Sequence, residues 1–459
     1  MDRIVVFLLL ILTGCAATPK DKDFEEMIFY VPKDYNNMSS GKIKLNAMIH
    51  RAKDKKNRIG LLVVNFGGPG GEAVEHASAM ISEKSFPQSI IDRFDILAID
   101  PRGTGKSEFI SDLTRCTFNH ECDSEKESVG FNISTMKFTQ DIDYIRKSLN
   151  EDKITFLGYS YGTKIGQLYS FLYPQNIRGV VLDSPTSIEH GNAIEESMTM
   201  PFSYERIMYH RLSKSEIELI KNINNKIKEH EIYTTKDGYK IDQDNFDKLL
   251  ATIISTNDDD WSNIKPSLIS FLKTEIFYDY IVKIQEIESS DSNDSSDSND
   301  SSDSNDSSDS NDSSDSSLAA AIASASTRSI NCSDENKPLL DSEIENSLPL
   351  FERKSSLLGS LAYNAYYNMC LGWKAKRDPL PYISKVNNRV PILIIGGKLD
   401  SVTPYEEAIK VDKMYLGNKK LVTVNNIVSH GFSFSYADAY VDYITEKYLL
   451  NPNSIIDNT

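Results

Sequence analysis

The sequence predicts an α/β protein with a mostly parallel sheet that carries helices on both faces. Short apolar runs typical of buried strands alternate with stretches of helical periodicity. The alternation fills residues 24–186 and resumes at residues 386–450, and a long segment of different character lies between them. We therefore expect one core domain in two parts, with a largely helical cap at residues 187–385 inserted after the sixth strand.

Each expected element follows from a local pattern. A turn through Asn36, Asn37 and Gly41 joins the first two strands, and the third strand runs into a glycine-rich loop. The predicted strands are Met27–Pro32, Ile43–Arg51, Ile59–Phe66, Phe94–Ile99, Ile154–Leu157, Ile177–Leu182, Val390–Ile395 and Lys420–Val424. The predicted helices are Met136–Asn150, Tyr161–Tyr173, Pro404–Tyr415 and Ser433–Leu450 in the core, with Ser213–His230 and Asp341–Tyr366 in the cap.

Composition and charge narrow the class of protein. The chain has 459 residues, of which 40% are hydrophobic, so a large core is available. Its net charge of −17 is unevenly placed, because residues 289–317 hold nine Asp and no Lys or Arg. The rest of the chain carries −8 and has no strongly basic region, so we expect no nucleic-acid partner.

An acidic repeat, Asp291–Ser317, lies inside the expected cap. Its hexad Asp-Ser-Asn-Asp-Ser-Ser contains no apolar residue, so burial cannot offset the entropy of ordering. We therefore expect residues 289–317 to form a disordered, solvated loop. The alternative is a calcium-binding repeat in a calcium-dependent adhesion protein. Known repeats of that kind carry a glycine and an apolar residue in each turn, and this one carries neither.

The N-terminus has the pattern of an export signal. Arg3 precedes the apolar run Ile4–Leu12, which is too short to span a bilayer as a stable helix. The ending Leu12-Thr13-Gly14-Cys15 resembles a bacterial lipobox, in which the cysteine receives a diacylglyceryl group. We therefore expect a lipoprotein signal peptide at residues 1–15, with Cys15 lipidated and the exported protein anchored to a membrane of the cell envelope. A plain secretory signal with an incidental cysteine is the alternative.

Four cysteines remain besides Cys15, namely Cys116, Cys122, Cys332 and Cys370. An even number in an exported protein favours two disulfides, for which three pairings are possible. Cys116 and Cys122 are close in sequence, and pairing them would leave Cys332 with Cys370. Four buried free thiols are the alternative. No Cys-x-x-Cys motif or histidine cluster indicates a metal site.

The pentapeptide Gly158-Tyr159-Ser160-Tyr161-Gly162 has the Gly-x-Ser-x-Gly pattern. A predicted strand precedes it and a predicted helix follows it. This is the context of the sharp turn that exposes a nucleophilic serine at the edge of a sheet. We therefore expect Ser160 to be a catalytic nucleophile, with a chance match in a loop as the alternative.

A nucleophilic serine needs a base, and the base needs an acid that orients it. His430 follows the last predicted strand, whereas the other six histidines lie in early strands, helices, loops or the cap. Asp400 follows the preceding strand and gives the chain order Ser, Asp, His that is typical of α/β-hydrolases. We therefore expect His430 as the base and Asp400 as its acid. Asp183, at the end of the sixth strand, is the rival acid.

Two backbone N–H groups are expected to stabilise the oxyanion of such a reaction. One belongs to Tyr161, which follows the nucleophile at the N-terminus of a helix. The other should come from the loop Gly67-Gly68-Pro69-Gly70, where we expect Gly68 to be the donor. A plain turn is one alternative, and phosphate binding is a weaker one, because no Lys-Ser/Thr follows the glycines. Acyl transfer by these residues needs no cofactor.

Seven segments match the pattern of a single family. They are Asn65–Gly71, Asp100–Ser107, Gly158–Thr163, Ile330–Asp334, Cys370–Trp373, Gly397–Pro404 and Ser429–Gly431. Together they resemble the tripeptidyl aminopeptidase-like branch of the prolyl aminopeptidase family of α/β-hydrolases. The chain departs from the branch at Phe66, where proline is usual, and in the Asp/Ser repeat, which has no counterpart.

The resemblance implies the α/β-hydrolase fold and a serine peptidase that releases residues from the free N-terminus of peptides. It also implies a disulfide between Cys332 and Cys370. Family members bind the substrate amine with cap carboxylates, for which the candidates are Glu189, Glu195, Glu196 and Glu205; a solvated helix face would explain these glutamates equally well. The alternative functions are an esterase or lipase on the same triad and a non-catalytic surface lipoprotein.

Overall fold

The computed structural model of the chain describes residues 24–119, 122, 124, 129–278, 280–282, 312–387 and 389–453, without the side chains of residues 259 and 312–317. The predicted signal peptide with Cys15 lies outside these residues, as does most of the Asp/Ser repeat. Within the described ranges, no helix is both long enough and apolar enough to cross a membrane.

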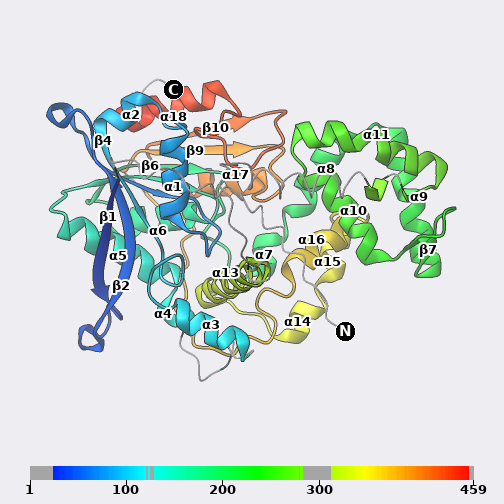
Figure 1. Cartoon of the computed structure of the whole chain (residues 1–459), viewed down its shortest axis with the longest axis horizontal. Helices are drawn as coiled ribbons and strands as arrows, with labels where there is room; N and C mark the ends of the chain where they lie inside the picture. Colours follow the sequence, from blue (N-terminus) through cyan, green and yellow to red (C-terminus); the bar gives the residue numbers. More distant parts are fainter. Residues whose placement is uncertain are drawn as a thin grey trace, which may run out of the picture.

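Eight strands form one sheet in the order β1-β2-β4-β3-β5-β6-β9-β10 (Figure 1). The strands are β1 (Phe24–Pro32), β2 (Lys42–His50), β3 (Gly60–Asn65), β4 (Phe94–Ile99), β5 (Ile154–Tyr159), β6 (Ile177–Asp183), β9 (Ile392–Gly397) and β10 (Lys419–Val424). β2 pairs antiparallel with β1 and with β4, and every other neighbouring pair is parallel. The predicted α/β-hydrolase fold with a mostly parallel sheet is confirmed.

Helices cover both faces of this sheet. β5 and β9 consist of buried residues only, which is why their sequences read as continuous apolar runs instead of alternating patterns. On one face lie α1 (Ala73–Ser82), α2 (Gln88–Arg93) and α18 (Ala439–Leu450). On the other lie α5 (Thr135–Ser148), α6 (Gly162–Leu172) and α17 (Tyr405–Met414).

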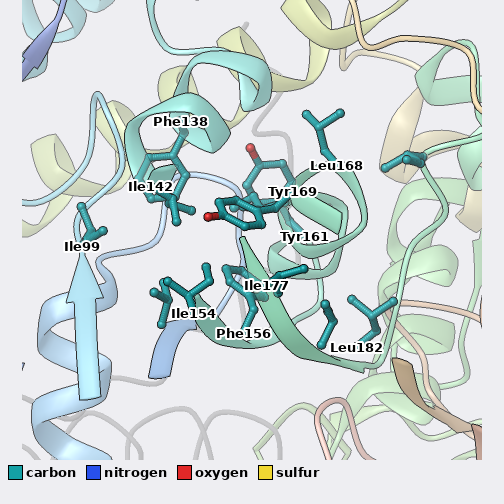
Figure 2. Packing of buried hydrophobic residues seen from close by; sticks show 14 of the residues in the cluster. Ile99, Phe138, Ile142, Ile154, Phe156, Tyr161, Leu168, Tyr169, Ile177 and Leu182 are labelled. Atoms are coloured by element: carbon teal, nitrogen blue, oxygen red, sulfur yellow. The ribbon is translucent and has the colours of Figure 1, made fainter. Parts of the chain in front are cut away.

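Figure 2 shows the packing on the second of these faces, where side chains of β5, α5 and α6 meet. Phe156 of β5 is fully buried there, together with Ile142 of α5. The ring of Tyr161, the residue after the predicted nucleophile, belongs to the same cluster. Truncating a fully buried phenylalanine such as Phe156 to alanine typically costs about 3–5 kcal/mol. The turn that carries Ser160 therefore rests on a well-packed core.

The cap forms between β6 and β9, as predicted. Its elements are α7 (Ala193–Ser197), α8 (Met200–Arg211), α9 (Lys214–His230), β7 (Tyr233–Thr234), β8 (Lys240–Ile241), α10 (Gln243–Ser255), α11 (Asp258–Thr274), α13 (Asp312–Asp334), α14 (Asp341–Glu345), α15 (Leu348–Glu352) and α16 (Gly359–Tyr366). Helices α8 to α11 form a lobe beside the sheet, and α13 runs closer to the core domain (Figure 1). Buried Ile207, Ile220, Phe246 and Phe271 pack together in the lobe, which thus has an apolar cluster of its own.

α13 begins at Asp312, inside the stretch that the sequence predicts to be disordered. The expectation of disorder for residues 289–317 is therefore wrong for residues 312–317, which are helical. The alanine-rich run after Leu318 favours a helix, and extending a helix costs much less free energy than starting one. Residues 289–311 of the repeat lie outside the described residues.

Two disulfides join the cysteines. Cys116, in α3 (Ile110–Phe118), pairs with Cys122, and Cys332, in α13, pairs with Cys370. The resemblance implies a disulfide between Cys332 and Cys370, and the structure contains this pairing. Both α3 and α4 (Val129–Asn132) contact α13, so the second disulfide secures a helix that lies against the core domain.

Candidate active site

Ser160 stands at a sharp turn between β5 and α6. Its φ of +53° is a left-handed conformation that costs free energy in a residue other than glycine. A Cβ atom at Gly158 would lie 2.6 Å from O of Gly162, and a Cβ atom at Gly162 would lie 2.6 Å from O of Asn65. Both glycines are therefore required by close backbone contacts, as expected for a Gly-x-Ser-x-Gly turn of this kind.

His430 is held by Asp400. Nδ1 of the ring lies 3.0 Å from Oδ2 and 3.1 Å from Oδ1 of the fully buried carboxylate. The N–H groups of Val402 and Thr403 donate to Oδ1 at 2.9 Å each, and the Thr403 hydroxyl donates to Oδ2 at 3.0 Å. A carboxylate can only accept, so Nδ1 donates its proton to Asp400 and Nε2 is the basic atom of the ring.

Opposing effects set the pKa of His430. Burial lowers it, because the charged ring is poorly solvated. The negative charge of Asp400 and its hydrogen bond raise it, and the charge of Asp183 raises it further. The net result is a pKa above the ordinary value of histidine, so the neutral ring is a stronger base than an ordinary histidine side chain.

Asp183, the rival acid, binds the loop that carries His430 and not the ring. Its fully buried carboxylate accepts the N–H of Phe432 at 3.1 Å and the N–H of Ser433 at 2.6 Å. Burial raises the pKa of Asp183 to about 6, although these N–H groups oppose the rise. Of the two predicted acids, Asp400 is therefore the one in contact with His430 within the described residues.

The carboxyl ends of β5, β6, β9 and β10 lie side by side in the sheet, and Ser184 connects the loops that follow them. Its hydroxyl accepts the N–H of Gly431 at 2.9 Å. Its carbonyl oxygen lies 2.9 Å from Oγ1 of Thr403 and shares the single hydroxyl proton with Asp400. Sequence reasoning did not single out Ser184; its position directly after a strand end was the available signal. Ser160, Asp400 and His430 thus follow β5, β9 and β10, whose carboxyl ends lie on the same side of the sheet.

The glycine loop after β3 lies against the turn at Ser160. Gly67 has a φ of +92°, and a Cβ atom there would lie 2.7 Å from O of Tyr159 and 3.1 Å from N of Tyr161. The Gly67 N–H donates to Oδ1 of Asn65 at 3.1 Å. The N–H groups of Gly68 and Tyr161, the predicted oxyanion donors, have no backbone acceptor in the described part of the chain. Both predicted donors thus stand in two loops that touch.

Phe66 occupies the position where proline is usual in the branch. Its ring stacks on Tyr159, with ring centroids 5.6 Å apart, and on His76, with centroids 5.5 Å apart. The Tyr159 hydroxyl donates to O of Ser433 at 2.8 Å. The departure at Phe66 therefore adds an aromatic stack that connects α1, the turn at Ser160 and the loop of His430.

The four predicted amine-binding glutamates are not brought together. Glu195 is exposed and accepts the N–H of Gly191 at 2.7 Å, and Glu189 is half-buried at the start of the cap. Glu205 lines an open groove of about 560 Å³, and Ser160 is not among the residues that line it.

Glu196, the fourth of them, belongs to a charged cluster. Its carboxylate lies 2.8 Å from Nζ of Lys164, on the helix that follows the predicted nucleophile, and accepts the Thr186 hydroxyl at 2.6 Å. Burial raises the pKa of Glu196, but the charges of Lys164 and His190 lower it more, so the net shift is downward. The negative charge of Glu196 is therefore already balanced within the protein.

Glu335 is a buried cap carboxylate that sequence reasoning missed. It accepts the N–H of Ala193 at 3.1 Å, and its Oε2 lies 3.3 Å from Nη2 of Arg377. Burial raises the pKa of Glu335, and the nearby charge of Glu196 adds to the rise despite the opposing effect of Arg377. Its position directly after the matched segment Ile330–Asp334 was the signal that could have identified it.

His190 is a half-buried histidine, which sequence reasoning left aside as structural. Its Nε2 lies 2.5 Å from Oε2 of Glu407, and Nζ of Lys410 lies 3.1 Å from Oε1 of the same carboxylate. Burial would raise the pKa of Glu407, but the charges of His190 and Lys410 lower it to about 2. The contact ties the start of the cap to α17 of the core domain, which supports the structural reading.

Two family models match the chain. The model described as the alpha/beta hydrolase fold matches residues 60–217, and the model described as TAP-like protein matches residues 355–458. The first range contains Ser160 and both predicted oxyanion donors. The second contains Asp400 and His430, so the two models meet at the site described above.

Three curated proteins are similar to this chain in sequence. Serine protease Hip1 of Mycobacterium tuberculosis is 32% identical over 181 residues, which are 33% of this chain and 34% of that protein. Tripeptidyl aminopeptidase of Streptomyces coelicolor is 23% identical over 435 residues, 87% of this chain and 76% of that protein. Carboxylesterase B of Mycobacterium tuberculosis is 30% identical over 136 residues, 30% of this chain and 25% of that protein. The chain thus matches about a third of the length of Hip1.

Among solved structures, proline iminopeptidase of Mycobacterium smegmatis overlaps with a TM-score of 0.40 and 11% identity, covering 94% of this chain and 95% of that one. The fold is assigned from the order of the strands in the sheet and not from this comparison. The sheet, the two family models and the curated relatives agree with the resemblance that the motifs carry. The chain therefore has the α/β-hydrolase fold, and its sequence is similar to those of serine protease Hip1 and of the tripeptidyl aminopeptidases.

Proposed function

We propose that this protein is an exported serine peptidase that releases residues from the free N-terminus of peptides. The observation that carries the proposal is the contact of His430 with Asp400, at the sheet edge where Ser160 stands on its strained turn. The similarity to tripeptidyl aminopeptidase over 87% of this chain supports the same class of substrate.

In the proposed reaction, Nε2 of His430 removes the proton of the Ser160 hydroxyl, and the Ser160 oxygen attacks the scissile carbonyl. Asp400 keeps Nδ1 protonated and stabilises the imidazolium that forms. His430 then gives the proton to the leaving amine, so that the amine departs and an acyl-enzyme remains. A water molecule, deprotonated by the same ring, releases the acyl group and restores Ser160.

The N–H groups of Gly68 and Tyr161 are proposed to bind the oxyanion of both tetrahedral intermediates. The positions of the two loops support this role, because a side chain at Gly67 would collide with the turn that presents Tyr161. Each donor of this kind contributes about 10²–10³-fold to the rate.

A cap carboxylate is proposed to bind the free amine of the substrate. Glu335 is a better candidate than Glu196, because the 3.3 Å contact of Glu335 with Arg377 leaves its pKa raised, whereas the 2.8 Å contact of Glu196 with Lys164 contributes to a lowered pKa. The raised pKa of Glu335 means that its surroundings do not favour the negative charge, which a substrate ammonium group would stabilise. Glu335 also follows Asp334, whose carboxylate is hydrogen-bonded to Thr135 beside Tyr161.

Export and lipidation of Cys15 are part of the proposal. The two disulfides support export, because disulfides persist in oxidising compartments. Radiolabelled palmitate fed to cells should label the protein and enter the membrane fraction with it. A Cys15→Ser variant should lose the label, and a variant that keeps the label would exclude Cys15 as the site.

Two matched substrates test the reaction. One is a tripeptide p-nitroanilide with a free N-terminus, and the other is the same peptide acetylated, each with Ser160→Ala as the control. Cleavage of the free peptide alone, lost in Ser160→Ala and weakened mainly in KM by Glu335→Gln, is the expected result. Equal cleavage of both peptides would exclude the aminopeptidase.

A carboxylesterase is the second candidate, supported by the 30% identity to carboxylesterase B over 136 residues. Cleavage of p-nitrophenyl butyrate with no cleavage of either peptide would establish it. A protein that leaves all three substrates intact and does not react with a fluorophosphonate probe would be the non-catalytic lipoprotein.

A further inference from the structure

One cap helix, α13, contacts the loop that carries Gly68. The Thr327 hydroxyl donates to O of Pro69, the next residue, at 2.6 Å. A Cβ atom at Gly70 would lie 2.9 Å from O of Ala323 and 3.0 Å from Oγ1 of Thr327. The loop backbone is therefore in direct contact with the helix, without room for a side chain between them.

The same helix reaches Tyr161 through Thr135. Asp334, its last residue, accepts the Thr135 N–H at 3.1 Å and the Thr135 hydroxyl at 2.5 Å. Oγ1 of Thr135 is also hydrogen-bonded to the Tyr161 hydroxyl. Thr135 is 0% exposed and Tyr161 is 5% exposed, and the Tyr161 ring packs within the core cluster of Figure 2. Bulk water therefore does not compete for these bonds.

The direction of these bonds depends on the charge of Asp334. When Asp334 is ionised it can only accept, so the Thr135 hydroxyl donates to Asp334 and the Tyr161 hydroxyl donates to Thr135. Burial raises the pKa of Asp334 to about 7, although the Thr135 hydroxyl and the charge of Lys164 oppose the rise. In either protonation state of Asp334, a buried chain of hydrogen bonds restricts the orientation of the Tyr161 side chain.

α13 is itself fastened to the cap. The disulfide Cys332–Cys370 joins it to a neighbouring segment, and Nη2 of Arg328 donates to O of Leu371 at 2.5 Å. Thr327 and Asp334, on either side of these anchors, are thus presented by a fixed helix. One element of the cap therefore determines the surroundings of both proposed oxyanion donors.

We propose that Thr327 and Asp334 are positioning residues of the oxyanion hole, and that α13 holds Gly68 and Tyr161 in the arrangement that stabilises the transition state. The inference rests on the proposed function, because it concerns the same site. Donors at an oxyanion are effective when they are in place before the charge develops. Since a displacement of about 1 Å can lower a rate by about 10²-fold, the cap contributes to catalysis itself and not only to the choice of substrate.

Two pairs of variants of the full-length protein test this inference. Tyr161→Phe removes the hydroxyl and keeps the backbone N–H. Its matched control is Tyr169→Phe, on the same helix and in the same cluster, whose hydroxyl instead bonds to Asp143 at 3.1 Å. Thr327→Val removes the bond to Pro69, and Thr327→Ser restores the hydroxyl. We would measure kcat and KM with the free tripeptide p-nitroanilide and with p-nitrophenyl butyrate, and the Ki of a peptide aldehyde that adds to Ser160.

We expect Tyr161→Phe and Thr327→Val to lower kcat about tenfold, because a displaced donor costs less than a missing one. KM should stay unchanged and the aldehyde should bind more weakly by the same factor. Tyr169→Phe and Thr327→Ser should behave like the unsubstituted protein. Thermal unfolding of each variant separates loss of fold from displacement of a donor.

Equal rates in Tyr161→Phe and Tyr169→Phe would overturn the inference, as would a loss confined to KM. If the unsubstituted protein cleaves neither substrate, or if Ser160→Ala retains the activity, the proposed function fails and this inference falls with it. If Ser160→Ala is inactive while Tyr161→Phe and Thr327→Val remain fully active, the inference alone fails.

Discussion

The carboxylate of Asp183 accepts the backbone N–H of Ser433 at 2.6 Å, three residues beyond His430. The bond joins the end of β6 to the loop after β10, while Asp400 contacts the ring of His430 from the end of β9. Two buried carboxylates at the ends of neighbouring strands thus position His430. Asp183 binds the backbone of the residues that follow His430, and Asp400 binds its ring. Their substitution should therefore have different consequences.

Asp400→Asn should lower kcat/KM by about 10³–10⁴-fold, because an amide at this position favours the wrong tautomer of the ring. Asp183→Asn retains an oxygen that accepts the Ser433 N–H, so we expect a loss of about tenfold or less. Initial rates with the free tripeptide p-nitroanilide measure both. A loss in Asp183→Asn as large as that in Asp400→Asn would reverse the assignment of the acid.

The pH profile should report the titration of His430. Its pKa lies above the ordinary histidine value of about 6.5, and only the neutral ring can act as the base. We therefore expect kcat/KM to rise with pH through a midpoint above about 6.5 and then to level off. Asp183→Asn removes a charge that raises this pKa, so its midpoint should move to lower pH. A midpoint that moves upward in Asp183→Asn would contradict the electrostatic account.

Alanine substitution at two glycines with the same φ should separate the effect of backbone strain from the effect of a steric collision. Gly67 and Gly41 both have a φ of +92°, but a Cβ atom at Gly67 would lie 2.7 Å from O of Tyr159, whereas one at Gly41 would meet nothing within 4 Å. Alanine should cost each site about 1–2 kcal/mol of strain. Only Gly67→Ala should also displace the loop and lower kcat, by about 10²-fold. Urea unfolding and kcat of both variants give the comparison, and a fully active Gly67→Ala would argue against the close contact.

Asp247, in the cap, should make stability depend on pH. Its buried carboxylate accepts hydrogen bonds from Gln243, Asn364 and Ser360, and burial raises its pKa to about 6. Between pH 4 and 6 the folded protein holds a proton that the unfolded chain has released, so the free energy of unfolding should fall as pH rises. The shift corresponds to about 3 kcal/mol at most.

Asp247→Asn should remove this part of the pH dependence, with the Asn364 amide turning to present its oxygen. Asp244→Asn, an exposed position on the same helix whose charge adds to the raised pKa of Asp247, should weaken this pH dependence only in part. Urea unfolding at pH 4, 5, 6 and 7 measures the slope. If Asp247→Asn and the unsubstituted protein lose stability in parallel, Asp247 is not the source.

The predictions that held depend on residues close in sequence. Gly158 and Gly162 belong to the same turn, so the pattern around Ser160 contains the reason for its conformation. Strand ends in a parallel sheet meet at one edge, so Asp400, which follows the strand before the last one, could be expected near His430. Asp183 gives the same chain order Ser, Asp, His, so the contact with the His430 ring, and not the chain order, distinguishes the two acids. The start of α13 at Asp312 differs from the predicted disorder of this segment, because the helix inside the acidic repeat depends on the alanines that follow it.

Contacts between the cap and the core domain could not be predicted in this way. Asp334 and Thr135 are 199 positions apart, and His190 and Glu407 are 217 positions apart. Whether such groups meet depends on how the cap helices pack, which no local pattern records. For the same reason Glu335 was missed.

The cap also separates the parts of the catalytic site along the chain. Ser160 lies before residues 283–311, and Asp400 and His430 lie after them, while neither disulfide crosses this stretch. One proteolytic cut there would leave two polypeptides with no covalent link, held together by packing and by the pairing of β6 with β9. The cleaved protein would thus be a non-covalent heterodimer of its N-terminal and C-terminal parts. Its activity would fall on dilution as the two parts dissociate, whereas the activity of the intact chain would not.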